Sequence, residues 1–215
     1  MEDIKKYYLI DVDVKPEKMK EFNIFWEEKL NEMQTMGMKH IGTFHIAAGE
    51  DNILHLQTLI KFTDFDKAIR SEVNNYSSGK WAELTDGVRS SILHLEEEDK
   101  ITDYYRQSLS DKDISSHLYY WMDIELKANM QNDFLADIVK EQSKMNQDLV
   151  GTEVATFTVL MGAESTTHIK RLCLIDNPSE WFEGECHHYH SDFWEYLAHW
   201  SKTTLLEPAT YSHLQ

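Results

Sequence analysis

The fold is decided by residues 7–22, which read YYLIDVDVKPEKMKEF. Side chains from Tyr7 to Val14 alternate between two faces, which predicts a half-buried β-strand. Pro16 suits the first turn of a helix, and apolar residues then recur at helical spacing to about residue 35. One face of the strand carries Tyr8, Ile10, Val12 and Val14, and the other carries Tyr7, Leu9, Asp11 and Asp13.

This stretch is repeated in the second half of the chain, first 112 and then 113 positions later. Self-similarity at a fixed interval is the mark of a duplicated unit, so one unit can be interpreted for both. The matched positions include Tyr7/Tyr119, Tyr8/Tyr120, Asp11/Asp123, Phe22/Phe134, Thr43/Thr156, His55/His168 and Trp81/Trp194.

A hairpin follows the long helix in each unit. Residues 40–47 and 53–62 predict two strands joined by a polar turn at 49–52, and the same turn signal returns at 162–165. The duplication therefore predicts a second hairpin around Gly162.

Two short helices and a strand complete the unit. Thr63 or Asp64 is expected to cap the first helix, Trp81 lies in the second, and residues 90–97 predict the final strand. The long helix of the second unit is expected at 128–148. The order is β-α-β-β-α-β, the ferredoxin-like arrangement.

A four-stranded sheet of this kind has helices on one face only, so its other face needs an apolar cover. A second copy on the same chain supplies that cover, and two such sheets would enclose a barrel-like core with the helices outside. We therefore predict an α+β fold with repeats at 1–98 and 117–215, joined by a polar linker at 99–116.

The sequence resembles the dimeric α/β-barrel superfamily, and most of all its NIPSNAP and antibiotic-biosynthesis monooxygenase group. The residues that carry the resemblance are 7–22, the hairpin 40–62, and SDFWEYL at 191–197. The resemblance covers nearly the whole chain and implies one barrel within one chain. Members of the superfamily include cofactor-free oxygenases and isomerases, haem enzymes, haem carriers and stress proteins, so the site must decide the function.

Composition narrows the classes of partner. The chain has 215 residues, 41% of them hydrophobic, and a formal net charge of −17. Such a protein is globular, and its acidity disfavours nucleic acid and anionic membrane surfaces as partners. We see neither a signal-peptide pattern nor a long apolar segment, so we expect a cytoplasmic protein that binds a small molecule and is able to form a homodimer. Cys173 and Cys186 are not at duplicated positions, and no disulfide is expected.

Asp11 with His55, and their duplicates Asp123 with His168, form the first candidate site. Alternation places Asp11 and His55 on the sheet face opposite Tyr8, where a carboxylate could hold an imidazole as a general base. The same pairs also suit a structural role, because polar groups buried between two sheets must find partners. Both interpretations remain open from the sequence.

The second candidate is the stretch CHHYH at 186–190, which the first half lacks. His188 or His190 could act as a base or as the axial ligand of a haem group. Adjacent histidines on a loop point in different directions, and no zinc motif accompanies them, so no metal site is predicted. The resemblance adds that related monooxygenases often carry a histidine before the last helix of the unit. A solvated polar loop is the competing interpretation.

Aromatic side chains around this stretch form the third candidate. Most aromatic residues at helical spacing belong to a core, but those near the histidines would also suit a flat, conjugated ligand. Polar anchors could come from Tyr120, Thr156 and either Lys170 or Arg171 of the second sheet. The predicted substrate-binding residues are Trp181, Phe182, Trp194, Trp200, Tyr120 and Thr156.

Two classes of function follow. The first is an enzyme, a cofactor-independent oxygenase or isomerase that acts on an apolar or aromatic metabolite in the second repeat, with His188 or His190 as base and Asp123 and His168 assisting. A haem-dependent enzyme or carrier is a variant of it that uses the same histidines. The second class is a non-catalytic ligand-binding or stress-response barrel.

Overall fold

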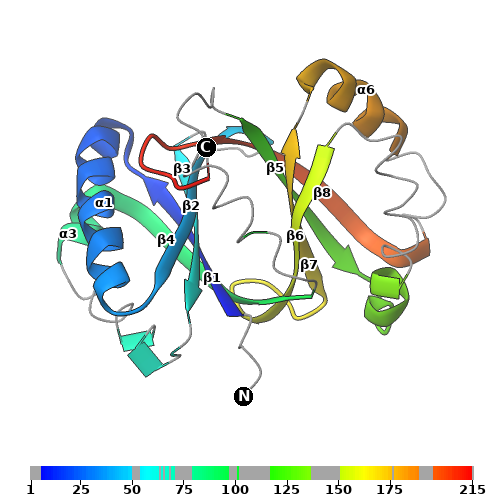
Figure 1. Ribbon diagram of the computed structural model, residues 1–215, viewed down its shortest axis with the longest axis horizontal. Helices are drawn as coiled ribbons and strands as arrows, with labels where there is room; N and C mark the ends of the chain where they lie inside the picture. The colour runs from blue at the N-terminus through cyan, green and yellow to red at the C-terminus, as the bar shows by residue number, and fades with distance from the viewer. Residues whose placement is uncertain are drawn as a thin grey trace.

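The computed structural model shows one closed barrel with helices outside it (Figure 1). The described residues are 6–49, 54–62, 64, 66–67, 69–70, 79–96, 101, 117–136, 151–175, 177–188 and 196–214, with the backbone alone described at 151 and 184–188.

The two halves have matching elements. The first half contains β1 (Lys6–Val14), η1 (Pro16–Lys18), α1 (Met19–Thr35), β2 (Lys39–Ala48), β3 (His55–Phe62), α3 (Gly79–Leu84) and β4 (Thr85–Leu95). The second half contains β5 (Leu118–Leu126), β6 (Gly151–Gly162), β7 (His168–Ile175), α6 (Pro178–His188) and β8 (Ala198–Pro208).

The strands close into a barrel in the order β1-β3-β2-β8-β5-β7-β6-β4, and every neighbouring pair is antiparallel. Within each half the order is that of a ferredoxin-like sheet. The halves join edge to edge, β2 to β8 and β4 to β6. The predicted fold of two ferredoxin-like units in one intrachain barrel is confirmed, and this closure leaves no free sheet edge among the described strands.

Alternation along the strands separates one inner core from two outer cores. The outer core of the first half lies between its sheet and α1, where Phe22, Trp26 and Trp81 pack together. The outer core of the second half includes Phe134 and Ile124. The barrel interior is filled by Tyr7, Leu9, Phe44, Leu59, Leu93, Tyr119, Trp121, Phe157, Leu172 and Leu206, among others.

A glycine lies at the same position of each seam between the halves. Gly49 has φ +97° and Gly162 has φ +137°, which other residues rarely adopt. A Cβ at Gly49 would lie 2.5 Å from the carbonyl oxygen of Thr203, and one at Gly162 would collide with that of Ser90. Ser90 and Thr203 are themselves duplicates, so the two seams are built alike.

Several predicted boundaries differ from the structure. The final strand of the first unit begins at Thr85, before residue 90, because β1 continues to pair as far as Val14 with Thr85. The described part of the helix predicted at 128–148 is 131–136, and it starts late because Asn129 adopts φ 68°. Asp64 does accept a hydrogen bond from the backbone N–H of Lys67, as a capping residue should.

The predicted linker 99–116 lies almost wholly outside the described residues. Ile101 is the exception, and it is fully buried in the inner core. At least this position therefore packs as core, whereas the sequence suggested a purely polar connector. The division into 1–98 and 117–215 stays a prediction.

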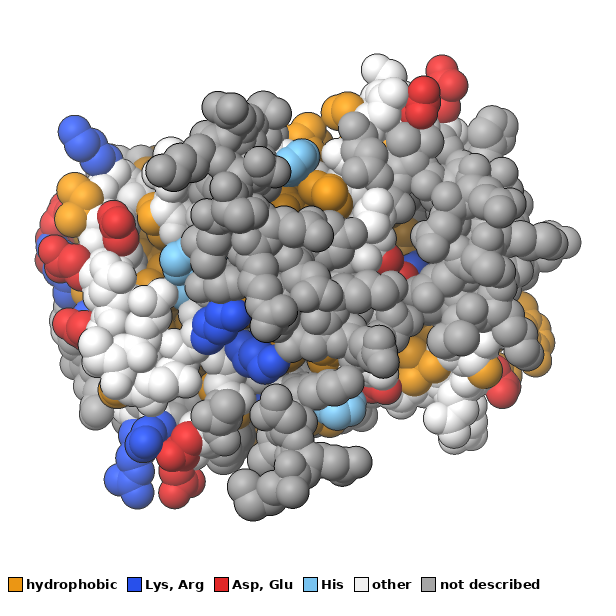
Figure 2. Space-filling model, viewed as in Figure 1, with side chains coloured by type: hydrophobic (Ala, Val, Ile, Leu, Met, Phe, Trp, Pro, Cys, Tyr) orange, Lys and Arg blue, Asp and Glu red, His pale blue; other side chains and the backbone are white. Residues whose placement is uncertain are grey.

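The visible surface mixes charges of both signs. On the face shown in Figure 2, basic and acidic side chains are interspersed among the described residues. No described helix is long and apolar enough to cross a membrane.

Candidate functional site

The second sheet divides the predicted site residues between its two faces. We call the face against which α6 packs the helix side, and the face toward the interior the barrel side. Tyr120 and Trp181 belong to the outer core and thus to the helix side. Asp123, whose neighbours Tyr119 and Trp121 are in the inner core, lies on the barrel side. One pocket cannot include both groups.

An aromatic contact marks the helix side. The rings of Tyr120 from β5 and Trp181 from α6 are 5.3 Å apart between centroids. The Nε1 of Trp181 is buried without a hydrogen-bond partner among the described residues. Asn177 positions α6, because its side-chain oxygen accepts a hydrogen bond from the backbone N–H of Ser179.

A buried ion pair lies on the helix side of the same sheet. The Nη2 of Arg171 is 2.5 Å from Oε2 of Glu153, and the side chains are each 6% exposed. The hydroxyl of Thr156 donates to the other oxygen of Glu153. Alternation had left open whether Lys170 or Arg171 faces the helices, and the structure places Arg171 there.

The guanidinium of Arg171 keeps unused donor capacity. Burial alone favours the neutral form, but the negative charge of Glu153 outweighs it and raises the pKa of Arg171 above its usual range. Its Nε is buried and has no hydrogen-bond partner in the described part of the chain. A buried donor without a partner costs free energy unless a ligand or water satisfies it.

The equivalent positions of the first half form a neutral and satisfied network. Here Thr58 replaces Arg171 and His40 replaces Glu153. The Trp26 indole donates to Thr58 Oγ1 at 2.9 Å, Thr43 Oγ1 lies 3.0 Å from Thr58 Oγ1, and His40 Nε2 lies 2.9 Å from Thr43 Oγ1. The charged helix-side group therefore belongs to the second half.

This first-half network makes stability depend on pH. Burial, with the nearby charge of His213, lowers the pKa of His40 to about 3. Between pH 6.5 and 3, His40 binds a proton in the unfolded chain but not in the folded chain, so the free energy of unfolding decreases as the pH falls through this window. We expect the free energy of unfolding to drop by about 2 kcal/mol from pH 7.5 to pH 5 on this account.

Urea unfolding at the two pH values measures this loss. His40→Gln, which keeps a hydrogen-bonding group near Thr43, should remove most of the difference. Burial also lowers the pKa of His213, so His213→Gln serves as the control for the smaller contribution of His213 to the pH-dependent loss of stability. A full pH dependence in His40→Gln would contradict the assignment.

On the barrel side, Asp123 is paired with Lys170 and not with His168. The amino group of Lys170, which is 2% exposed, donates to Asp123 and lies 2.7 Å from Glu164. His168 instead lies 3.2 Å from the hydroxyl of Ser165. The register explains this arrangement, because β5 and β7 place Asp123 directly opposite Lys170.

In the first half, the predicted carboxylate–imidazole pair is present. His55 Nε2 lies 3.1 Å from Asp11 Oδ1, and its Nδ1 lies 3.4 Å from Asp13 Oδ1. Burial opposes ionisation of Asp11, but the hydrogen bond from His55 and the charge of Lys170 prevail and lower its pKa. Because both nitrogens of His55 already face carboxylates of the same sheet, neither is left to contact a substrate, and the geometry favours the structural interpretation.

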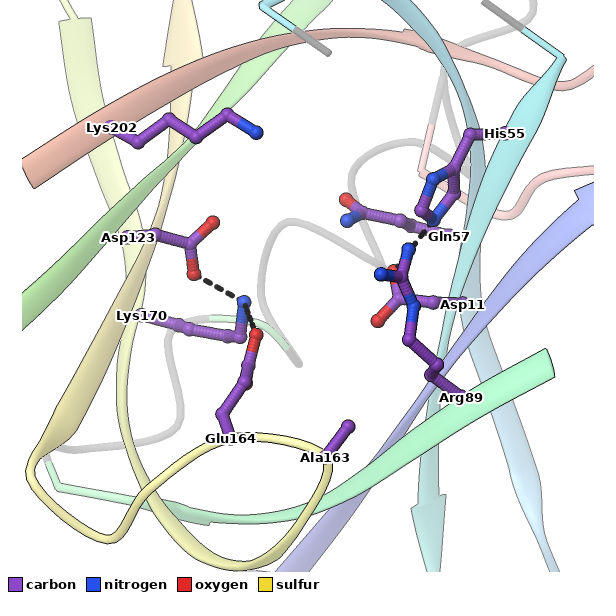
Figure 3. Close-up of a pocket in the computed structure, with 9 residues that line it drawn as sticks. All are labelled: Asp11, His55, Gln57, Arg89, Asp123, Ala163, Glu164, Lys170 and Lys202. Carbon is purple, nitrogen blue, oxygen red and sulfur yellow. Dashed lines mark hydrogen bonds and ion pairs between the residues drawn. The ribbon is translucent and has the colours of Figure 1, made fainter. Parts of the chain in front are cut away.

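These barrel-side groups enclose a cavity of about 200 Å³ (Figure 3), which we call the barrel-mouth cavity. Strands from both halves contribute to it. Its lining consists of Asp11, His55, Gln57, Arg89, Asp123, Ala163, Glu164, Lys170 and Lys202.

The remaining predicted residues lie elsewhere. Phe182 is 66% exposed on α6, so it lies at the surface of the part of the chain that the structure describes. Trp200 is 43% exposed, donates to Glu125 at 2.5 Å and packs edge-on against His168. Among the described members of the predicted aromatic group, Trp181 contacts Tyr120, whereas Phe182 and Trp200 are exposed.

The histidine stretch 186–190 is partly helical. The backbone of α6 continues to His188, whereas a loop was expected there, since the helix that begins after Asn177 extends without a break to that residue. The side chain of His188 and all of His190 and Trp194 lie outside the described residues.

A haem group on the helix side would need an imidazole directed at the sheet. Of the histidines in the second half whose side chains are described, His168 packs against Trp200 on the barrel side, His199 is exposed, His213 packs against His40 of the first half, and His117 directly precedes β5. The described helix-side residues offer an ion pair and the thiol of Cys173, which is not in a disulfide, and none of these is the histidine ligand that was predicted. The described helix-side residues therefore include no haem ligand, and the predicted ligands His188 and His190 lie where no side chain is described, so no step is derived through haem.

Some residues of these sites were not predicted from the sequence. Glu153, Arg89 and Lys202 were missed as site residues. The sequence did contain a signal for these residues. Gln57 and Lys170 are duplicates that differ in charge, and Arg89 and Lys202 are charged duplicates on strands that are otherwise rich in apolar residues. Glu153 could have been found as the acid that replaces His40.

No protein-family model matches the sequence, and no curated protein matches it. The fold, in contrast, matches solved structures over the whole chain. An anthrone oxidase-like protein has a TM-score of 0.63 at 10% identity, covering 100% of this chain and 95% of that chain.

Two further structures are similar. A "putative monooxygenase" from Fusobacterium nucleatum has a TM-score of 0.57 at 13% identity, with 97% and 94% of the two chains covered. Chlorite dismutase from Candidatus Nitrospira defluvii, in complex with imidazole, has a TM-score of 0.63 at 8% identity, with 98% and 93% covered. At these identities the likeness establishes the shared α/β-barrel fold.

Proposed function

We propose that the protein is a small-molecule enzyme that works without a bound cofactor, as an oxygenase or isomerase of an apolar or aromatic metabolite. Its site is the helix side of the second sheet. The observation that carries the proposal is the buried guanidinium of Arg171, whose Nε has no hydrogen-bond partner among the described residues and which stands where the first half has Thr58. Because this buried charge is present in the second half and its counterpart in the first half is neutral, we infer that the second half has become specialised.

The chemistry needs an apolar surface and a donor for a developing negative charge. The neighbouring rings of Tyr120 and Trp181, tilted by 44° to each other, offer an aromatic surface for a flat substrate. A base removes a proton from a hydroxyl group, or from a carbon next to a carbonyl, and the Nε–H of Arg171 stabilises the resulting phenolate or enolate. In an isomerase the proton returns to another carbon. In an oxygenase the carbon of the anion adds to dioxygen, the second substrate, and the resulting hydroperoxide loses water to leave a carbonyl group, so the substrate itself supplies all the electrons.

The sequence nominates His188 or His190 as the base, and that assignment stays part of the proposal. Asp123 and His168 are left out, because they lie on the barrel side. The anthrone oxidase-like and monooxygenase neighbours support oxygenase chemistry on an aromatic substrate. The closer likeness to the NIPSNAP group, assembly into a homodimer and a cytoplasmic location also remain proposals.

Oxygen uptake with anthrones, quinols and enolisable diketones tests the proposal. Arg171→Met alone would leave Glu153 buried without its partner, so the informative variant is Glu153→Gln with Arg171→Met, which removes both charges. We expect this double variant to fold and to lose activity by about 10²-fold. Lys170→Gln is the matched control, since it changes the next residue of the same strand on the opposite face, and it should keep full activity.

Three results would count against the proposal. Equal loss in both variants would show that stability rather than the site is affected. Binding of these compounds without turnover would identify a ligand-binding protein. A Soret band in the purified protein that disappears in His188→Ala or His190→Ala would identify a haem protein instead.

A further inference from the structure

The barrel-mouth cavity is a second site, separate from the helix side, and its lining is arranged in duplicate pairs. Asp11 and Asp123 come from β1 and β5, and Arg89 and Lys202 from β4 and β8. Each cation stands directly opposite one of these carboxylates in the strand register. The pairing is broken at one position, where Gln57 in the first half corresponds to Lys170 in the second.

That difference leaves hydrogen-bond acceptors directed at the cavity. Asp11 can only accept, so Gln57 turns its amide NH₂ to Asp11 and helps to lower the pKa of that carboxyl. Its carbonyl Oε1 is buried and without a partner among the described residues, in a side chain that is 4% exposed overall. On the other wall, Glu164 gives one oxygen to Lys170, and its Oε2 is buried and equally unpartnered in the described part. Figure 3 shows both side chains projecting toward the space between the walls.

The same cavity also presents cations. Arg89 is exposed at the rim and has neither an ion pair nor a hydrogen bond with any described residue. Lys202 extends toward the cavity from the other half (Figure 3). A guanidinium at a rim is suited to hold a carboxylate through two parallel hydrogen bonds.

Charge balance and size restrict the occupant. Besides His55, three carboxylates and three Lys or Arg side chains line the cavity, so a ligand with net charge would unbalance these six charges, whereas a neutral zwitterion would not. The volume of about 200 Å³ equals roughly six or seven water molecules, below the usual range for drug-sized ligands.

We propose that the barrel-mouth cavity binds a small zwitterion of the amino-acid class. Its ammonium group donates to Gln57 Oε1 and Glu164 Oε2, and its carboxylate lies against Arg89 and Lys202. The buried acceptors Gln57 Oε1 and Glu164 Oε2 favour a ligand with an ammonium group. The cations Arg89 and Lys202 favour a ligand that also has a carboxylate. Because the site lies on the opposite face of the second sheet from Arg171, it is independent of the activity proposed above.

Isothermal titration of the full chain with L-alanine and larger L-amino acids, with propionate and ethylamine as half-ligands, tests the proposal. We expect saturable binding of at least one amino acid and binding of each half-ligand weaker by about tenfold or more. Arg89→Gln and Glu164→Gln should each weaken amino-acid binding by about tenfold. Arg70→Gln replaces an exposed arginine that does not line the cavity, and it should leave binding unchanged.

Failure of every amino acid to bind at up to about 10 mM would show a cavity filled by solvent and would overturn the proposal. Equal binding of propionate or ethylamine would overturn it as well, by showing a simple ion site. So would unchanged affinity in both cavity variants. None of these results affects the oxygen-uptake test, because Arg89→Gln leaves the helix side intact.

Discussion

Gly162→Ala is expected to destabilise the barrel by about 3 kcal/mol or more. The new methyl group would meet the backbone of Ser90 and Ser91, with Ser91 Cα only 2.5 Å away, and the φ of +137° is itself strained for alanine. Backbone atoms of a neighbouring strand cannot move aside as a flexible side chain can. The cost therefore falls on the seam between β4 and β6, which joins the two halves.

Denaturant unfolding measures the effect. Gly79→Ala is the control, because a Cβ there meets nothing within 4 Å and the residue begins α3. Gly49→Ala, at the other seam, should behave like Gly162→Ala. If Gly162→Ala were as stable as Gly79→Ala, the seams would not be as tightly closed as the structure shows.

Lys170→Met is expected to cost about 3–5 kcal/mol. The substitution keeps the length of the side chain but leaves Asp123 and Glu164 without the cation that both contact. Their charges, together with that of Asp11, overcome the effect of burial and raise the pKa of Lys170, which shows how strongly the folded state favours the ammonium form.

The natural first half supplies the matched control. Lys170→Gln places there the residue found at the duplicate position, Gln57, whose amide donates to Asp11. It should cost clearly less than Lys170→Met, because an amide can donate to Asp123 in the same way. The free energies of unfolding are measured with urea at pH 7. Equal losses in the two variants would mean that hydrogen bonding and charge at position 170 do not stabilise Asp123 and Glu164.

The duplication was the strongest information in the sequence. Pairs such as Tyr7/Tyr119 and Gly49/Gly162 set the element order, and alternation in β1 placed Asp11 on the barrel side. These features could be predicted because they depend on local periodicity and on repetition, both of which are properties of the chain itself.

Which side chains of β7 face the barrel and which face the helices could not be predicted in this way. The strand reads HIKRLCLI, with apolar residues on both faces, since one face covers the barrel core and the other the outer core. Alternation between apolar and polar residues is then lost, so nothing distinguishes Lys170 from Arg171. The partner of Asp123 was mistaken for a related reason, because the register that sets Lys170 opposite it depends on tertiary pairing.

The central claim is that, of the two helix sides of the barrel, only that of the second half has kept a site for an aromatic substrate. A crystal structure of the protein with a bound phenolic ligand, such as an anthrone, tests it most directly. We predict the ligand ring against Tyr120 and Trp181, with a ligand oxygen within hydrogen-bond distance of Arg171 Nε. A ligand found between the first sheet and α1, or in the barrel-mouth cavity with the helix side empty, would contradict the claim.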